Sequence, residues 1–330
     1  MLQSYVHRAF SHYPMKVIPA SPSGFWSVVR FNPFIGMAAA LLCVLPVTAR
    51  GQIYLTNVTN SSSSGAIGAY NLDGTTVNAS LVTGLSNPGG GLAVSGSDLF
   101  VTVTGTPEKI SEYTTLGGTV NASLVTGLNG PAGLAISGSN LFVVNNGPGT
   151  IGEYTTAGAT VNAALFSTGV DNPLGIAVSG SNIFVANGAP GTIGEYTTSG
   201  TTVNAALITG LDFPYGIAIS GSDIFVVNQN NGTIGEYTTS GGIVNSTLIS
   251  GLNQPDNIAI LGSDLFVTNS GNGTIGEFTT SGTVVNSALI SGLTAPGAFV
   301  AVPEPSIWAL LAGGVVMFFA YVRRHQGNAA

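Results

Sequence analysis

Short apolar runs separated by turn residues fill the chain between residues 51 and 302. A representative unit contains four such runs, over 175–178, 183–186, 192–196 and 202–208. Ser-Gly turns separate the first run from the second and the third from the fourth, which is the sequence chemistry of tight hairpins. The runs are β-branched and bounded by glycine, and none has the 3.6-residue period of a helix. The pattern therefore predicts four consecutive strands in each unit.

This unit repeats along the chain. The acid of a Gly-Glu-Tyr-like motif recurs at spacings of 41, 42, 41 and 41 residues, as Glu112, Glu153, Glu195, Glu236 and Glu277. Four short strands at this period are typical of one blade of a β-propeller. The repeat region opens on a second-strand segment, 53–57, and ends on a first-strand segment, 297–302. These two segments would complete one blade. We therefore predict an all-β fold, a six-bladed β-propeller over residues 52–302 whose four-stranded blades are closed by pairing the N-terminal and C-terminal strands.

Five of the units carry the pattern Pro-x-Gly-Ile-Ala-Val-Ser-Gly-Ser-Asp-Ile-Phe-Val or a close variant of it. This pattern resembles the NHL-type propeller repeat across nearly all of residues 51–302. The third strand of each unit departs from that repeat, because it carries Gly-Glu-Tyr where NHL repeats have basic residues. The RNA-binding and protein-binding functions of NHL proteins therefore do not transfer to this chain through the resemblance.

The charge and the residue types of the chain argue against several classes of function. Charged residues make up 6% of the chain, the net charge is −7, and Lys109 is the only cation of the repeat region. No basic surface is present to neutralise phosphates, so we expect no nucleic-acid partner. The repeat region also lacks His, Cys and Arg, which leaves little for nucleophilic catalysis or a zinc site. We predict a non-enzymatic protein without a cofactor. If its acidic side chains did bind an ion, Ca²⁺ would suit them. The alternative is a metal-dependent lactonase or hydrolase, since six-bladed gluconolactonase-like enzymes use acidic and amide side chains.

The N-terminal 51 residues read as a signal peptide. Arg30 precedes an apolar run over 35–47, and small residues follow it. That order of a basic, an apolar and a small-residue region is typical of secretory signals. We therefore predict that the protein is exported.

The C-terminal segment, 303–330, combines a short motif, an apolar run and a basic end. The run over 307–322 carries no charge and is shorter than the roughly 20 residues that span a bilayer comfortably, yet it predicts a transmembrane helix. The motif and the basic end are Pro303, Glu304, Pro305, Arg323 and Arg324. This order resembles the PEP-CTERM sorting signal of Gram-negative bacteria. The resemblance implies an exosortase-type sorting enzyme as partner, a transient inner-membrane anchor, and delivery to the outer surface or extracellular matrix. A permanent single-span anchor is the alternative.

The loops that follow the second and fourth strands of each unit are expected to lie together around the axial entrance of a propeller. They are rich in amides, carboxylates and occasional aromatics, which suit a polysaccharide or a surface protein as ligand. The candidate ligand-binding residues are Asn145, Asn187, Asn228, Asn269, Asp171, Asp212, Phe213, Tyr215 and Asp256. The sequence thus predicts an exported, surface-sorted binding or scaffold protein.

Two repeated polar positions are expected to have structural roles. The repeated Glu should lie too far from the axis for its copies to share one metal ion. The repeated Asn of a Val-Asn pair, which occurs six times, should satisfy backbone groups at a blade edge or turn.

Overall fold

The computed structural model describes residues 51–58 and 64–303, which contain twenty-four strands in six four-stranded antiparallel sheets. Residues 1–50 of the predicted signal peptide (1–51) and residues 304–330 of the predicted sorting tail (303–330) lie outside the described residues. Within the described part of the chain, no helix is long and apolar enough to cross a membrane.

The strands are grouped here by blade, from the innermost strand outward. They are β24 (Pro296–Val302), β1 (Gln52–Val58), β2 (Ser64–Asn71) and β3 (Thr76–Ser86) in blade 1; β4 (Pro88–Ser95), β5 (Asp98–Val103), β6 (Lys109–Thr114) and β7 (Thr119–Thr126) in blade 2; β8 (Pro131–Ser137), β9 (Asn140–Asn145), β10 (Thr150–Thr155) and β11 (Thr160–Phe166) in blade 3; β12 (Pro173–Ser179), β13 (Asn182–Asn187), β14 (Thr192–Thr197) and β15 (Thr202–Ile208) in blade 4; β16 (Pro214–Ser220), β17 (Asp223–Asn228), β18 (Thr233–Thr238) and β19 (Ile243–Ile249) in blade 5; β20 (Pro255–Leu261), β21 (Asp264–Asn269), β22 (Thr274–Thr279) and β23 (Val284–Ile290) in blade 6.

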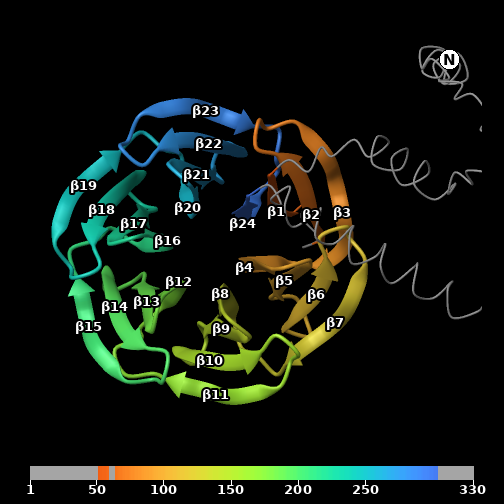
Figure 1. Ribbon diagram of the computed structural model, residues 1–330, viewed down its shortest axis with the longest axis horizontal. Helices are drawn as coiled ribbons and strands as arrows, with labels where there is room; N and C mark the ends of the chain where they lie inside the picture. The colour runs from red at the N-terminus through yellow and green to blue at the C-terminus, as the bar shows by residue number, and fades with distance from the viewer. Residues whose placement is uncertain (1–50, 59–63, 304–330) are drawn as a thin grey trace, which may run out of the picture. The chain divides into compact units, whose positions relative to one another are not determined.

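The six blades form a closed ring, with the first strand of each blade nearest the axis and the fourth at the rim (Figure 1). The closure joins the two ends of the repeat region. β1 pairs antiparallel with β24, and Ile53 lies opposite Ala301 while Leu55 lies opposite Phe299. The predicted blade count and the predicted closure are both confirmed. The closing pair matters because it removes the two sheet edges that an open arrangement would leave.

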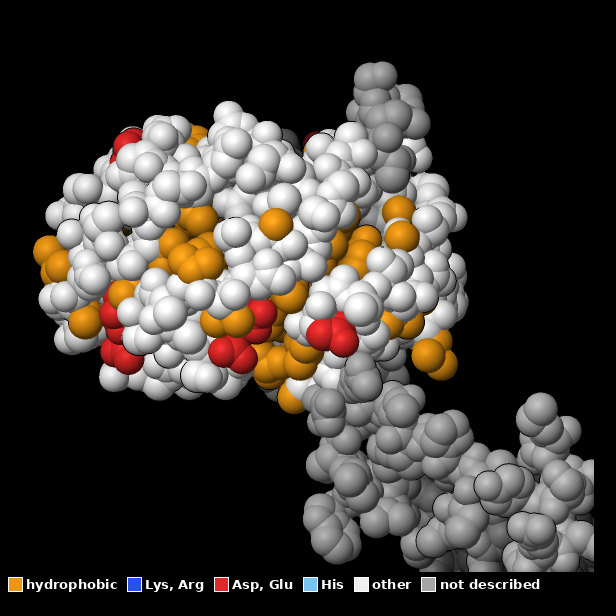
Figure 2. All heavy atoms as spheres, turned by 90° about the horizontal axis from the view of Figure 1, so that it is seen from above, with side chains coloured by type: hydrophobic (Ala, Val, Ile, Leu, Met, Phe, Trp, Pro, Cys, Tyr) orange, Lys and Arg blue, Asp and Glu red, His pale blue; other side chains and the backbone are white. Residues whose placement is uncertain are grey.

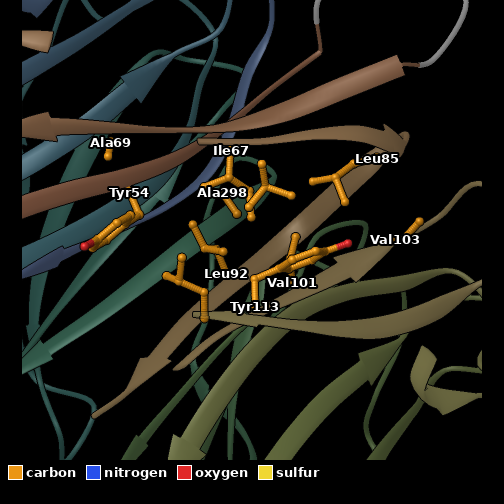
Figure 3. Packing of buried hydrophobic residues seen from close by; sticks show 11 residues of the cluster. Tyr54, Ile67, Ala69, Leu85, Leu92, Val101, Val103, Tyr113 and Ala298 are labelled. Atoms are coloured by element: carbon orange, nitrogen blue, oxygen red, sulfur yellow. The ribbon is translucent and has the colours of Figure 1, made fainter. Parts of the chain in front are cut away.

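The hydrophobic core lies between neighbouring blades. In the second strand of each blade the apolar residues are buried on both faces, and the central aromatic residue is at most 3% exposed in all six blades, as Tyr54, Phe100, Phe142, Phe184, Phe225 and Phe266. Figure 3 shows one such interface, where Tyr54 and Ile67 of blade 1 pack with Leu92, Val101 and Tyr113 of blade 2. The uninterrupted apolar runs in the sequence follow from this two-sided burial.

Contact between neighbouring blades also requires glycine in the hairpin between the third and fourth strands. Gly200 has a φ of +88°, and a Cβ at this position would lie 2.8 Å from the carbonyl oxygen of Leu165 in the preceding blade. No L-residue fits that approach without movement. The same contact recurs at Gly117, Gly158, Gly241 and Gly282.

The outermost strands are largely exposed, and the repeated Asn protects their backbone. Asn204 Oδ1 accepts a hydrogen bond of 3.1 Å from the backbone N–H of Ala206, two residues further on. The other five blades make the same bond, from Ser80, Ser123, Ala164, Thr247 and Ala288 to Asn78, Asn121, Asn162, Asn245 and Asn286. The prediction that this Asn satisfies backbone groups at the blade edge is confirmed.

Candidate functional site

Two sets of loops meet on one face of the propeller, which we call the loop face. They are the loops after the second strand and the loops after the fourth strand of each blade. Asn146, in the loop after β9, donates hydrogen bonds of 3.0 Å to Asn172 Oδ1 and 2.9 Å to the carbonyl oxygen of Pro173, both at the start of the next blade. Amide side chains therefore tie neighbouring blades together on this face, as the expected loop arrangement requires.

Four candidate asparagines close the second strand of their blades and are buried. Asn187 is fully buried, its Oδ1 accepts the backbone N–H of Asp171 at 3.2 Å, and its Nδ2 donates to the carbonyl oxygen of Gly169 at 3.2 Å. Asn228 and Asn269 are 3% exposed and accept equivalent backbone N–H groups. Asn145 is 5% exposed. As ligand-binding candidates, Asn145, Asn187, Asn228 and Asn269 were expected to be exposed. The structure buries all four. Asn187, Asn228 and Asn269 instead hold the loop that leads into the first strand.

The blades differ most at one position of the innermost strand. In five blades this position follows the first proline of the strand, and in β4 the ladder places it at Gly90, because β4 contains one extra residue. Around the axis, these six residues are Gly90, Ala132, Leu174, Tyr215, Asp256 and Gly297. Large or polar side chains thus gather on blades 4, 5 and 6, and small residues occupy blades 1, 2 and 3. We call this set of six positions the axial ring.

Tyr215 reaches across the axis from blade 5 to blade 2. Its hydroxyl oxygen lies 3.7 Å from the place that a Cβ on Gly90 would occupy, and the backbone of Ala132 lies beside it. Burial, together with the charge of Asp256 on the neighbouring blade, raises the pKa of Tyr215 to about 12. The phenol is therefore neutral and able to donate a hydrogen bond at physiological pH. Within the described residues this hydroxyl has no hydrogen-bond partner.

Asp256, on the blade next to that of Tyr215, is held by polar side chains of the loop face. Its Oδ1 accepts a short hydrogen bond from Gln229 Nε2 in the loop after β17. Burial raises the pKa of Asp256, and the side chains of Ser270 and Gln229 oppose that rise. The axial ring thus carries a neutral donor on blade 5 and a partly buried carboxyl on the neighbouring blade 6.

Phe213 lies in a backbone conformation that bulky residues rarely adopt. Its φ is +56°, and the equivalent residues before the first strand are Asn87, Asn172 and Gln254, with φ between +47° and +49°. A Cβ on Gly188 would contact the Phe213 ring at 3.4 Å and Leu174 at 2.8 Å, so ring and leucine lie together between blades 4 and 5. A non-glycine residue in left-handed backbone is a strained position, and such positions gather at functional sites.

The two remaining candidates are exposed. Asp171 and Asp212 lie at the loop face, where Asp212 Oδ1 accepts a hydrogen bond of 3.1 Å from Asn230 Nδ2. The structure therefore brings Asp212, Phe213, Tyr215 and Asp256 together on blades 5 and 6, with Asp171 on blade 4. Sequence reasoning missed Gln229 and Leu174. The hydrogen bond to Asp256 connects Gln229 to this place, and the position after the first proline of β12 connects Leu174 to it.

The chemistry available here is hydrogen bonding and apolar contact. In the described part of the chain, no group of three or more His, Cys, Asp or Glu side chains is arranged to hold a metal ion. One side of the molecule in Figure 2 shows acidic side chains among a mostly uncharged surface. A ligand at the axial ring would meet the Tyr215 phenol, the Asp256 carboxyl and the Gln229 amide that is bonded to it.

No family model matches this chain, and no curated protein matches it either. Solved structures do resemble it. A chain of a nidogen–laminin complex aligns with a TM-score of 0.64 at 17% identity and covers 77% of this chain and 99% of its own length. A functionally unknown protein from Desulfotomaculum acetoxidans gives a TM-score of 0.55 at 16% identity, covering 78% of this chain and 100% of that one. A catalytically inactive variant of virginiamycin B lyase from Staphylococcus aureus, with quinupristin, gives 0.52 at 20% identity, covering 78% and 94%. These likenesses establish the six-bladed propeller fold.

Proposed function

We propose that this protein is an exported, surface-sorted, non-enzymatic propeller that binds an extracellular polysaccharide at its loop face. The observation that carries the proposal is the gathering of the blade-specific residues. Phe213, Tyr215 and Asp256 differ in chemistry from the equivalent residues of the other blades, and all three lie on blades 5 and 6. In a scaffold of repeated blades without a ligand, residues that differ from the repeat would not be expected to gather at one side of the axis.

The chemistry of this place suits a sugar. An aromatic ring offers an apolar surface, while the Tyr215 hydroxyl, the Asp256 carboxyl and the Gln229 amide are donors and acceptors held at fixed positions. A protein ligand is the second candidate, because a structural neighbour is a chain of a nidogen–laminin complex. A metal-dependent lactonase would need several convergent carboxylates, and the axial ring contributes one, Asp256.

Binding is tested with the purified full chain on a glycan array, followed by titration of the glycans that bind. Tyr215→Ala and Asp256→Asn are each expected to weaken binding by at least about tenfold, equivalent to about 1.4 kcal/mol. Tyr215→Phe removes only the hydroxyl and separates hydrogen bonding from packing. Val203→Thr, on the exposed outer strand, is the matched control and should bind like the wild type.

Absence of any glycan signal, with the fold intact by circular dichroism, would overturn the polysaccharide ligand. Binding that persists unchanged in both Tyr215→Ala and Asp256→Asn would instead place the ligand elsewhere on the surface. Tight metal binding together with hydrolysis of a lactone would favour the enzyme alternative.

Export and sorting rest on the N-terminal and C-terminal segments and have their own experiment. Replacing Pro303, Glu304 and Pro305 by alanine should retain the chain in the inner-membrane fraction, whereas the wild type should reach the outer surface or matrix. An identical distribution of the two proteins would exclude an exosortase-dependent route.

A further inference from the structure

Grooves between neighbouring blades open on the face opposite the loop face. One groove of about 450 Å³ lies between blades 2 and 3, and another of about 570 Å³ lies between blades 5 and 6. Each is lined by an Asp at the start of the second strand and a Glu of the third strand, namely Asp98 with Glu112 and Asp223 with Glu236. These grooves are separate from the axial ring.

The two acids of each pair lie on the same face of one sheet. In the β5–β6 ladder Phe100 pairs with Glu112 and Asp98 pairs with Thr114, so Asp98 is the diagonal neighbour of Glu112. The same register joins Asp223 to Glu236, and in blade 6 it joins Asp264 to Glu277. Three of the six blades therefore carry the pair.

Two other blades show how close these side chains come. Blades 3 and 4 have Asn where the others have Asp, and the register is otherwise the same. Asn140 Nδ2 donates to Glu153 Oε1 at 2.8 Å, and Asn182 Nδ2 donates to Glu195 Oε1 at 2.7 Å. An Asp at this position can therefore bring a carboxylate oxygen close to the Glu oxygen, with no hydrogen between the two when both are ionised.

The Asp of each pair accepts a hydrogen bond from the hydroxyl of the serine before it, at 3.3 Å from Ser97 to Asp98, but Glu112 has no such partner among the described residues. It is 9% exposed, it lines the groove, and within the described residues no hydrogen bond reaches its carboxyl group. Burial, and after it the nearby Asp98, raises the pKa of Glu112. Two carboxyl groups at close range in a half-enclosed groove are costly unless a proton or a cation lies between them.

We propose that each of the three pairs, Asp98 with Glu112, Asp223 with Glu236 and Asp264 with Glu277, binds one divalent cation of the hard, oxygen-preferring class, with Ca²⁺ as the physiological ion. Residues with hydroxyl groups line the grooves from both blades, namely Ser95 and Thr156 in one groove and Ser220 and Thr280 in the other. Ca²⁺ accepts six to eight oxygen ligands and tolerates water among them. Two carboxylates place the affinity in the weak range of extracellular Ca²⁺ modules, on the order of 10⁻⁴–10⁻³ M. Each ion would also link one blade to the next.

The experiment is equilibrium dialysis and calorimetric titration of the purified full chain with CaCl₂ at neutral pH. The wild type should bind three Ca²⁺ ions per chain, one for each pair. The triple variant Asp98→Asn, Asp223→Asn, Asp264→Asn should lose all three. This variant installs the residue that blades 3 and 4 already use, so it should retain the fold, which its circular dichroism spectrum checks.

A second variant tests the proposal in the opposite direction, by adding acid pairs instead of removing them. Asn140→Asp with Asn182→Asp recreates the acid pair in blades 3 and 4 and should bring two further Ca²⁺ ions per chain. Unchanged Ca²⁺ binding in the triple variant would overturn the proposal, as would the absence of binding at millimolar Ca²⁺. Uptake of protons by the pairs without any Ca²⁺ binding would also overturn the proposal, because a proton shared by the two carboxyl groups would then stabilise each pair in place of the cation. None of these results depends on whether the axial ring binds a polysaccharide.

Discussion

Asn182 donates a hydrogen bond of 2.7 Å to Oε1 of Glu195 across strands β13 and β14, and Glu195 is only 8% exposed. The repeated Glu of the Gly-Glu-Tyr motif therefore has a defined partner in this blade. Asn140 and Glu153 repeat the bond in blade 3. In these two blades the expected structural role of the acid is confirmed, since the acid joins two strands of its own sheet.

Removing the amide at position 182 should destabilise the protein. Asn182→Ala would leave a nearly buried carboxylate without its donor, and a hydrogen bond to a charged group contributes about 1.5–3 kcal/mol. We expect a loss of this size in the free energy of unfolding, measured by urea titration. Ser181→Ala, at the neighbouring exposed turn position, should change it by no more than about 0.5 kcal/mol. Equal effects of the two variants would show that the bond contributes nothing.

Asn187→Ala tests the structural role of the buried asparagines. Asn187 accepts the backbone N–H of Asp171 and donates to the carbonyl oxygen of Gly169 and to Thr192 Oγ1. Loss of these bonds in a fully buried place should cost about 2–3 kcal/mol of unfolding free energy. Asn230→Ala, an exposed amide of the same face, should cost about 0.5 kcal/mol or less. A stable Asn187→Ala protein would indicate that the side chain is free for another role.

Gly200→Ala and Gly180→Ala together separate two reasons why a glycine is needed in a hairpin, namely its backbone conformation and its contact with the preceding blade. Both glycines have positive φ, +88° and +58°, but only at Gly200 would a Cβ meet a neighbouring carbonyl oxygen, at 2.8 Å. Gly180 has open space around it. We expect Gly180→Ala to cost about 1 kcal/mol and Gly200→Ala clearly more, by thermal and urea unfolding. The reverse order would mean that the hairpin tip does not pack on the preceding blade.

Asp256 should make stability depend on pH in a defined direction. Its pKa in the folded state is raised above the ordinary value of 3.8, mainly by burial, so the folded protein holds this proton more tightly than the unfolded chain. The stability from this group is complete below that ordinary value and is lost as the pH rises through the raised pKa. Asp256→Asn should therefore gain stability relative to the wild type as the pH rises from 3.8 through the raised pKa of Asp256. Urea titrations of both proteins across that range check this, and a difference that stays constant with pH would contradict it.

Much of the fold could be predicted from local sequence, while only part of the candidate site could. Phe213, Tyr215 and Asp256 stand out as departures from the repeat, and the structure does place them on adjacent blades. Asn187 has the same polar character as an exposed loop amide. Its burial depends on the path of the following loop, which residue type does not reveal.

The sequence by itself determined the number of blades, the four strands in each and the closure of the ring by β1 and β24, because these follow from a period of 41 or 42 residues and from the phase at which it starts and stops. Only the tertiary structure decided that Tyr215 extends toward Gly90 and that Asp98 lies diagonal to Glu112. The first relationship depends on the diameter of the closed ring, and the second depends on strand register. The packing of whole sheets determines both relationships, so the residues next to either partner in the sequence do not predict them.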